Sequence, residues 1–180
     1  MLLLQFVSSK KCALRSFDTK AAFLQGKNQK DRVLAIEPVL QIIQVMQLTP
    51  QEICKLEKEA YGLVDVPYMW YQAILEELVS LGFEQSPFDP CLFILRNSKT
   101  LKPDGILGLH VDDGLYAGNQ YFHQKLELLE KKYPFGSKRI NNFIFTGIDI
   151  QQSSDGTIHL SQSKYVRALD PIKISPDRRK

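Results

Sequence analysis

Two adjacent carboxylates, Asp112 and Asp113, lie in the stretch 106–118, where an apolar run leads up to them and a shorter one leaves from Gly114. Apolar runs separated by Asp and Gly are typical of a β-hairpin, because these residues tolerate the backbone of a tight turn. Such a hairpin would hold a pair of negative charges at its tip. The alternative is a solvated turn in which the Asp side chains make only local hydrogen bonds.

A third carboxylate, Asp18, follows a short strand expected over 12–17. By itself this Asp fits equally well as the N-cap of a helix, where it would accept backbone N–H bonds. If an antiparallel sheet brings the end of this strand beside the hairpin, three carboxylates meet at one sheet edge and repel one another. Divalent cations relieve such repulsion, and Mg²⁺ prefers oxygen ligands. Two ions about 4 Å apart would activate a 3′-hydroxyl and stabilise a pyrophosphate leaving group.

The composition is that of an ordinary globular domain, with 180 residues, 44% of them hydrophobic and 24% charged. A net charge of +3 is compatible with a nucleic-acid partner and does not require one. Three widely spaced cysteines form no metal or disulfide pattern, which favours a reducing compartment. The absence of a transmembrane-length run or signal peptide predicts a cytoplasmic protein without membrane contact.

Two helices are expected from apolar side chains at helical spacing. The first begins near Pro67, which suits a first helical turn, and ends before Gly82, a left-handed C-cap. The second begins after Asn119, a suitable N-cap, and stops at Pro134. The apolar positions are Trp70, Tyr71, Ile74, Leu75, Leu78 and Val79 in the first, and Phe122, Leu126, Leu129 and Tyr133 in the second.

The remaining pattern mixes short strands with short helices. Helices are expected over 2–7 and 163–169, and 39–48 is ambiguous between helix and strand. Neighbouring strands joined by tight turns favour an α+β fold, in which helices pack on one face of an antiparallel sheet. The expected strands are 12–17, 33–36, 53–56, 91–95, 106–111, 115–117, 143–151 and 157–162.

Ordered blocks of the chain resemble the reverse transcriptase of copia-type LTR retrotransposons. The Asp-Val-Lys-Thr-Ala-Phe-Leu-Asn-Gly block of that family is matched by Asp18-Thr-Lys-Ala-Ala-Phe23-Leu-Gln-Gly26. Its Tyr-Val-Asp-Asp block appears as His110-Val111-Asp112-Asp113. Other matching segments are Cys54-Lys-Leu-Glu-Lys-Glu-Ala-Tyr61-Gly62-Leu63, Trp70-Tyr71, Gly82-Phe83, Ser86, Asp89, Cys91-Leu92-Phe93 and, more weakly, 143–166.

The resemblance implies a polymerase palm with a ferredoxin-like antiparallel sheet, in one reverse transcriptase domain over 1–180 that is truncated at both ends, with incomplete fingers and thumb. It implies an RNA-directed DNA polymerase that acts on an RNA template, a DNA primer and dNTP. Asp18, Asp112 and Asp113 would be catalytic and would hold two Mg²⁺, for which Mn²⁺ could substitute. Phe23 would pack against the incoming sugar and exclude a 2′-hydroxyl; the alternative is an ordinary core aromatic.

Two departures from the family pattern concern the nucleotide pocket and the hairpin. Asp65 stands where the family has a Gln near the bound nucleotide, and a carboxylate there would repel a triphosphate unless protonated or paired with a metal. His110 replaces the Tyr of the Tyr-Val-Asp-Asp block. These changes leave two alternatives open: an inactive remnant that keeps the palm fold and binds nucleic acid weakly, or a protein-interaction module in which Asp-Asp-Gly is only a turn.

Overall fold

The computed structural model describes residues 2–26, 33, 35–49, 51–56 and 63–170, so the segment 57–62 of one family block lies outside the described residues. Its centre is a six-stranded antiparallel sheet in the order β4-β5-β6-β7-β1-β8. The strands are β4 (Phe83–Gln85), β5 (Leu92–Arg96), β6 (Pro103–His110), β7 (Asp113–Gly118), β1 (Arg15–Thr19) and β8 (Phe135–Ile140). Strands β4 and β8 have no counterpart among the strands expected from the sequence.

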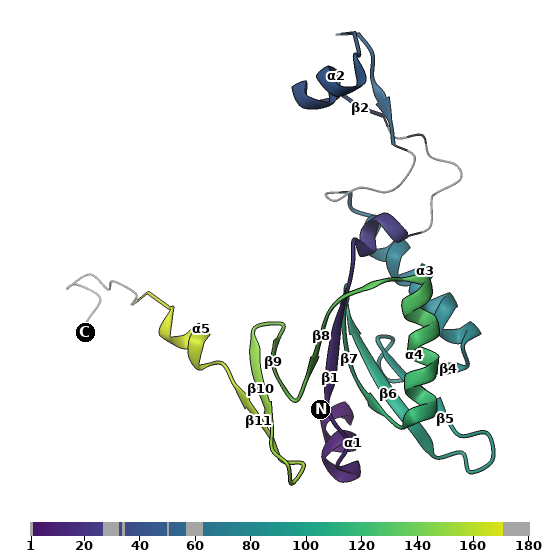
Figure 1. Cartoon of the computed structure of the whole chain (residues 1–180), viewed down its shortest axis with the longest axis vertical. Coiled ribbons are helices and arrows are strands. Elements are labelled where there is room, and N and C mark those ends of the chain that lie inside the picture. The colour runs from purple at the N-terminus through teal and green to yellow at the C-terminus, as the bar shows by residue number, and fades with distance from the viewer. Residues whose placement is uncertain (1, 27–32, 34, 50, 57–62, 171–180) are drawn as a thin grey trace, which may run out of the picture.

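Helices α3 (Val66–Ser80) and α4 (Gln120–Lys132) cover one face of this sheet (Figure 1). Both predicted helices are therefore confirmed, with Pro67 in the first turn of α3 and Gly82 beyond its end at φ 92°. The Asn119 side chain accepts a hydrogen bond of 3.0 Å from the Phe122 backbone N–H and caps α4. Val79, expected on the apolar face, is instead 54% exposed.

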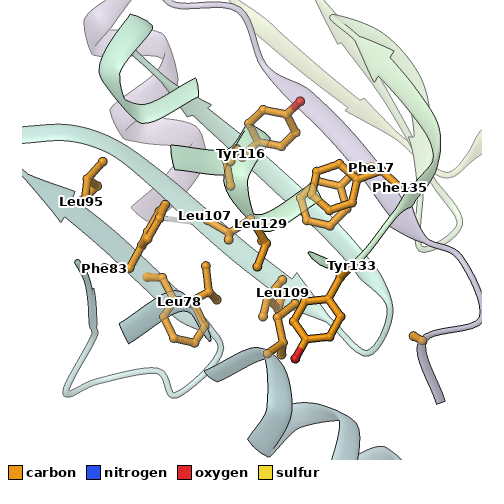
Figure 2. Packing of buried hydrophobic residues seen from close by; sticks show 14 of the residues in the cluster. Phe17, Leu78, Phe83, Leu95, Leu107, Leu109, Tyr116, Leu129, Tyr133 and Phe135 are labelled. Carbon is orange, nitrogen blue, oxygen red and sulfur yellow. The ribbon is translucent and has the colours of Figure 1, made fainter. Parts of the chain in front are cut away.

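The core between these helices and the sheet is rich in aromatic rings (Figure 2). The rings of Phe17 from β1 and Phe135 from β8 stack with centroids 3.8 Å apart. Trp70 of α3 meets Tyr133 edge to face, with centroids 5.1 Å apart. Stacked and edge-to-face pairs of this kind contribute about 0.5–1.5 kcal/mol beyond the apolar area that they bury.

The opposite face of the sheet packs against α1 (Leu2–Lys10) and a second, three-stranded sheet in the order β11-β10-β9. The side chains of successive strand residues point to opposite faces; Leu107 and Tyr116 accordingly lie in the first core, Ile106 and Ala117 in the second. The strands of this sheet are β9 (Asn142–Phe145), β10 (Ile148–Gln152) and β11 (Ile158–Ser161).

The prediction of a single strand over 143–151 is wrong, because the chain reverses within this range and forms the β9–β10 hairpin. Thr146 and Gly147 supply the turn with φ of 48° and 84°, which are the two positive values that a type I′ hairpin turn needs. The ambiguous 39–48 segment contains helix α2 (Leu40–Met46).

Smaller elements complete the described part of the chain. A short 3₁₀-helix, η1 (Ala22–Gln25), follows β1, and α5 (Ser163–Arg167) follows β11. Strands β2 (Ala35–Ile36) and β3 (Cys54–Lys55) pair with each other. None of the described helices combines the length and the apolar character that crossing a membrane would need.

A glycine pair beneath α4 gives a first prediction. Gly105 and Gly118 are cross-strand partners, and a Cβ added at Gly118 would lie 2.5 Å from the buried Phe122 ring. We expect Gly118→Ala to lower the free energy of unfolding by about 1–3 kcal/mol, because the ring must move within a packed core. Urea unfolding followed by circular dichroism measures the change. Gly108→Ala is the control, since its Cβ would meet Leu3 at 3.4 Å; an equal loss in both variants would contradict this account.

Candidate active site

The register between β1 and β7 brings the first and last of the three predicted carboxylates together. Asp18 of β1 is the direct cross-strand partner of Asp113 of β7. Such partners in an antiparallel pair have Cα atoms about 4.5–5.5 Å apart and side chains on the same face. Asp112 precedes β7, and its carbonyl accepts a 2.8 Å hydrogen bond from the Thr19 N–H at the end of β1. All three residues therefore lie at one end of two adjacent strands.

Two details differ from the sequence-based expectation. Asp18 lies inside β1 rather than after it and caps no helix, because the strand continues to Thr19. The hairpin turn is formed by Val111 and Asp112, whereas Asp113 already belongs to β7 and pairs with His110. The backbone of Asp113 is therefore held by the sheet rather than by the turn.

The turn that carries Asp112 has an unusual backbone. Val111 has φ of 57°, which is rare for a β-branched residue and persists only where surrounding contacts hold it. The indole N–H of the buried Trp70 in α3 donates a 2.8 Å hydrogen bond to the Val111 carbonyl. Together with the Thr19–Asp112 bond, this contact holds the turn from both the helix and the neighbouring strand.

Strand β8 has a β-bulge opposite Asp18. Two residues of β8, Gly136 and Ser137, face the single residue Asp18, which defines a bulge, and bulges are common beside active sites. A Cβ added at Gly136 would lie 2.2 Å from Oδ2 of Asp18, so the carboxylate lies directly over this glycine. The ladder pairs on either side of the bulge are Phe17 with Lys138 and Thr19 with Phe135.

Ser137 makes two hydrogen bonds to Asp18. Its backbone N–H and its hydroxyl each donate to Oδ1 of Asp18 at 2.5 Å. The hydroxyl bond is the main cause of a pKa of Asp18 below its usual range, and the backbone bond acts in the same direction. Ser137 is a site residue that the sequence does not reveal, because nothing in the local pattern marks it as part of a site.

The opposite shift occurs at Asp113. Burial raises the pKa of the Asp113 carboxyl, and the negative charges of Asp112 and Asp18 raise it further. His110, its cross-strand partner, and Arg139 of β8 lower it through their positive charge. The three carboxylates therefore interact electrostatically, and a histidine and an arginine moderate their repulsion.

The donor set is suited to a divalent cation, but the side chains are not arranged around one. In the part of the chain that the structure describes, no three His, Cys, Asp or Glu side chains are placed to hold a metal ion. Asp18 instead contacts Ser137. Carboxylate oxygens are nevertheless the ligands that Mg²⁺ prefers, and mutual repulsion at Asp113 is what a cation would relieve. The three carboxylates therefore fit a divalent cation in their chemistry, whereas the described side chains are not placed around one.

The two residues predicted for the nucleotide pocket lie in adjoining segments. Phe23 is half-buried in η1 and packs against the main core, as the core-aromatic alternative expects. Asp65 immediately precedes α3, and its carbonyl accepts a 3.0 Å bond from the Met69 N–H. Gly26, which follows η1, lies against the N-terminal part of α3: a Cβ added at this glycine would lie 3.1 Å from the backbone nitrogen of Trp70. Contact with a nucleotide stays a prediction for both residues.

The raised pKa of Asp113 gives a second prediction. A carboxyl whose pKa is raised by folding destabilises the fold above that pKa, and this penalty disappears as the pH falls below the ordinary value of Asp. Asp113→Asn should therefore stabilise the protein at pH 7, by less than about 1 kcal/mol because solvent screens these charges. The gain should vanish near pH 3. Urea unfolding at both values measures it, with Asp149→Asn in β10 as control; destabilisation at pH 7 would contradict the electrostatic account.

Comparison with known proteins shows extensive similarity to one family. Residues 1–172 match the profile of the family described as "Reverse transcriptase (RNA-dependent DNA polymerase)". The chain is 30% identical over 158 residues to a retrovirus-related Pol polyprotein from transposon RE1 of Arabidopsis thaliana, covering 87% of this chain and 10% of that protein. A Pol polyprotein from transposon TNT 1-94 of Nicotiana tabacum is 28% identical over 116 residues, which are 64% of this chain and 8% of that protein.

A solved structure of apo telomerase from Candida tropicalis, truncated from the C-terminal domain, is a distant structural neighbour. The alignment covers 89% of this chain and 38% of that one, with a TM-score of 0.47 and 13% identity. The family assignment thus depends on the sequence matches, which extend over nearly the whole chain and over about a tenth of the curated relatives. This chain belongs to the reverse transcriptase family, and its relatives are the Pol polyproteins of copia-type retrotransposons.

Proposed function

We propose that this chain supplies the catalytic palm of an RNA-directed DNA polymerase, which adds dNTP to the 3′-hydroxyl of a DNA primer on an RNA template. Asp18, Asp112 and Asp113 are the proposed ligands of two Mg²⁺, with Mn²⁺ as a substitute. The observation that supports this proposal best is the register that sets Asp18 opposite Asp113, with Asp112 in the adjoining turn. The proposal includes the cytoplasmic location expected from the sequence.

The residues of the chain have separate tasks in this proposal. When bound, the paired cations supply Lewis-acid stabilisation of the attacking and leaving oxygens. Asp18 and Asp113 present carboxylates from a rigid pair of strands, and Asp112 presents a third from a turn held by Trp70. Positioning of this kind dominates catalysis of phosphoryl transfer, because the reacting groups must be aligned and their charge balanced.

The proposed nucleotide pocket lies where η1 meets α3. Phe23 would form an aromatic wall against the sugar of the incoming nucleotide and exclude a 2′-hydroxyl by contact. Asp65 adds a negative charge at the N-terminus of α3, an end that otherwise favours anions through the helix dipole. This charge would oppose triphosphate binding unless a cation accompanies the nucleotide.

A second candidate function is a catalytically inactive reverse transcriptase palm that binds nucleic acid weakly. Two observations favour it: the described carboxylates are not arranged around a cation, and Asp65 replaces the family's Gln. A protein whose Asp-Asp pair served only as a turn would bind neither Mn²⁺ nor nucleic acid in a salt-dependent way.

Primer extension distinguishes the two candidates. We expect the chain to incorporate labelled dNTP on a primed RNA template with Mg²⁺. Asp112→Asn and Asp113→Asn should each lower the rate by about 100-fold or more, because transition-state charge loses its preorganised partner. Asp149→Asn removes an acidic side chain from β10 and is the matched control. Incorporation that survives Asp112→Asn would refute the metal assignment, and a complete lack of incorporation would favour the inactive palm.

Sugar selection tests the role of Phe23. We expect Phe23→Ala to raise the relative use of ribonucleotides by about 10-fold or more, since removal of the ring leaves room for the 2′-hydroxyl. The measurement compares kcat/KM for dTTP and for the matching ribonucleotide. Leu24→Ala, in the same 3₁₀ turn, is the control because this side chain is 41% exposed. Unchanged sugar selection in Phe23→Ala would support the core-aromatic alternative.

A further inference from the structure

Among the residues that the structure describes, the bulge in β8 contacts the carboxylate of Asp18, a proposed catalytic residue, and belongs to none of the predicted motifs. We propose that Gly136 and Ser137 are positioning residues, which set the carboxylate of Asp18 for cation binding. This inference rests on the proposed function, since it assumes that Asp18 is a metal ligand. It goes further by assigning a task to a strand that connects the catalytic residues with the second sheet.

Ser137 restrains Asp18 through two donors from a single residue. The backbone N–H and the hydroxyl both reach Oδ1, each at 2.5 Å. Hydrogen bonds to a charged carboxylate are short and strongly directional. Two of them on one oxygen fix both the rotamer of Asp18 and the plane of its carboxylate. A single donor would leave the carboxylate free to rotate.

Packing does not explain the presence of a serine here. Ser137 is exposed, whereas Phe135 is the buried residue of this strand and stacks on Phe17 on the other face of the sheet. The stack anchors the strand, and the bulge then directs Ser137 toward Asp18. The hydroxyl therefore serves Asp18 rather than the core.

Gly136 is required for a different reason. Its φ is not among the positive values of the chain, so backbone freedom does not select a glycine at this position. A Cβ would instead lie 2.2 Å from Oδ2 and 3.0 Å from Cγ of Asp18. Any side chain at 136 would push the carboxylate out of its position, while the missing side chain lets it rest over the strand.

These contacts match the way in which proteins orient metal ligands. Carboxylates that bind a metal are themselves held by hydrogen bonds, and removal of such a partner commonly weakens metal affinity by about 10–100-fold. Ser137 makes this kind of contact to Asp18. Arg139, which follows in the same strand, adds positive charge near both Asp18 and Asp113. Strand β8, at the edge of the sheet beside β1, thus supports Asp18 in the proposed metal site.

Mn²⁺ binding to the full chain at pH 7, followed by electron paramagnetic resonance, tests the assignment. Ser137→Ala should weaken Mn²⁺ binding by about 10-fold. Ser137→Thr, which keeps the hydroxyl, should bind Mn²⁺ with the affinity of the parent chain. Gly136→Ala should weaken binding at least as much. The matched controls are Gly108→Ala, whose Cβ has room, and Ser161→Ala in β11, whose hydroxyl bonds to Ser163. Urea midpoints of all variants should show that each remains folded.

A second measurement needs no cation. The amide proton of Ser137 should resonate downfield in the nuclear magnetic resonance spectrum, because it donates to a carboxylate, and should move upfield in Asp18→Asn. The same resonance should shift in Gly136→Ala, where the carboxylate is displaced, and stay in place in Gly108→Ala. An amide that does not respond to Asp18→Asn would overturn the proposed contact.

The outcomes separate this inference from the proposed function. If Asp18→Asn binds Mn²⁺ as the parent does, or the parent binds none, the metal assignment fails and this inference fails with it. If Asp18→Asn loses binding while Ser137→Ala and Gly136→Ala retain parental affinity, the metal site stands and the positioning role is wrong. Tighter binding in Ser137→Ala would also overturn it, since Ser137 would then hold Asp18 away from the cation.

Discussion

The antiparallel pairing of β1 with β7 is the interaction on which the site depends. Its register sets Asp18 opposite Asp113 on one face and packs Phe17 over Gly114 on the other, where an added Cβ would lie 2.3 Å from the ring. A slip by one residue would exchange the two faces and drive Asp18 toward the core. Core packing of Phe17 therefore fixes the position of charges that the core never touches.

The same coupling extends to the helices and to β8. Trp70 connects the buried side of α3 to the strained turn at Val111, and the stack of Phe135 on Phe17 holds the strand that presents Ser137. The carboxylates gather at this point although burial, and after it their mutual repulsion, raises the pKa of Asp113. Charge repulsion and the strained turn at Val111 both lower the stability of the folded state. Such local destabilisation is common at functional sites.

The sequence by itself determined the parts that depend on local patterns. Helices α3 and α4 follow from apolar side chains at helical spacing and from Pro67, Gly82 and Asn119 at their ends. The hairpin before β7 follows from apolar runs around an Asp-Asp-Gly segment, and ordered motifs identified the family. Two turns were predicted wrongly: the position of the turn before β7, and the reversal at Gly147 within the single strand expected over 143–151. Positive φ at Val111 and Thr146 is not apparent from residue type.

Only the tertiary structure decided how these parts meet. Strand β8 has a single buried residue, Phe135, so it shows none of the alternation by which a strand is recognised. It forms because β1 offers an unpaired edge, and its bulge brings Ser137 to Asp18 across 119 positions of sequence. Hydrogen bonds between residues so far apart depend on register and edge pairing, which local propensity does not encode. The carboxylates were visible in the sequence, but the residue that holds Asp18 became visible only in the fold.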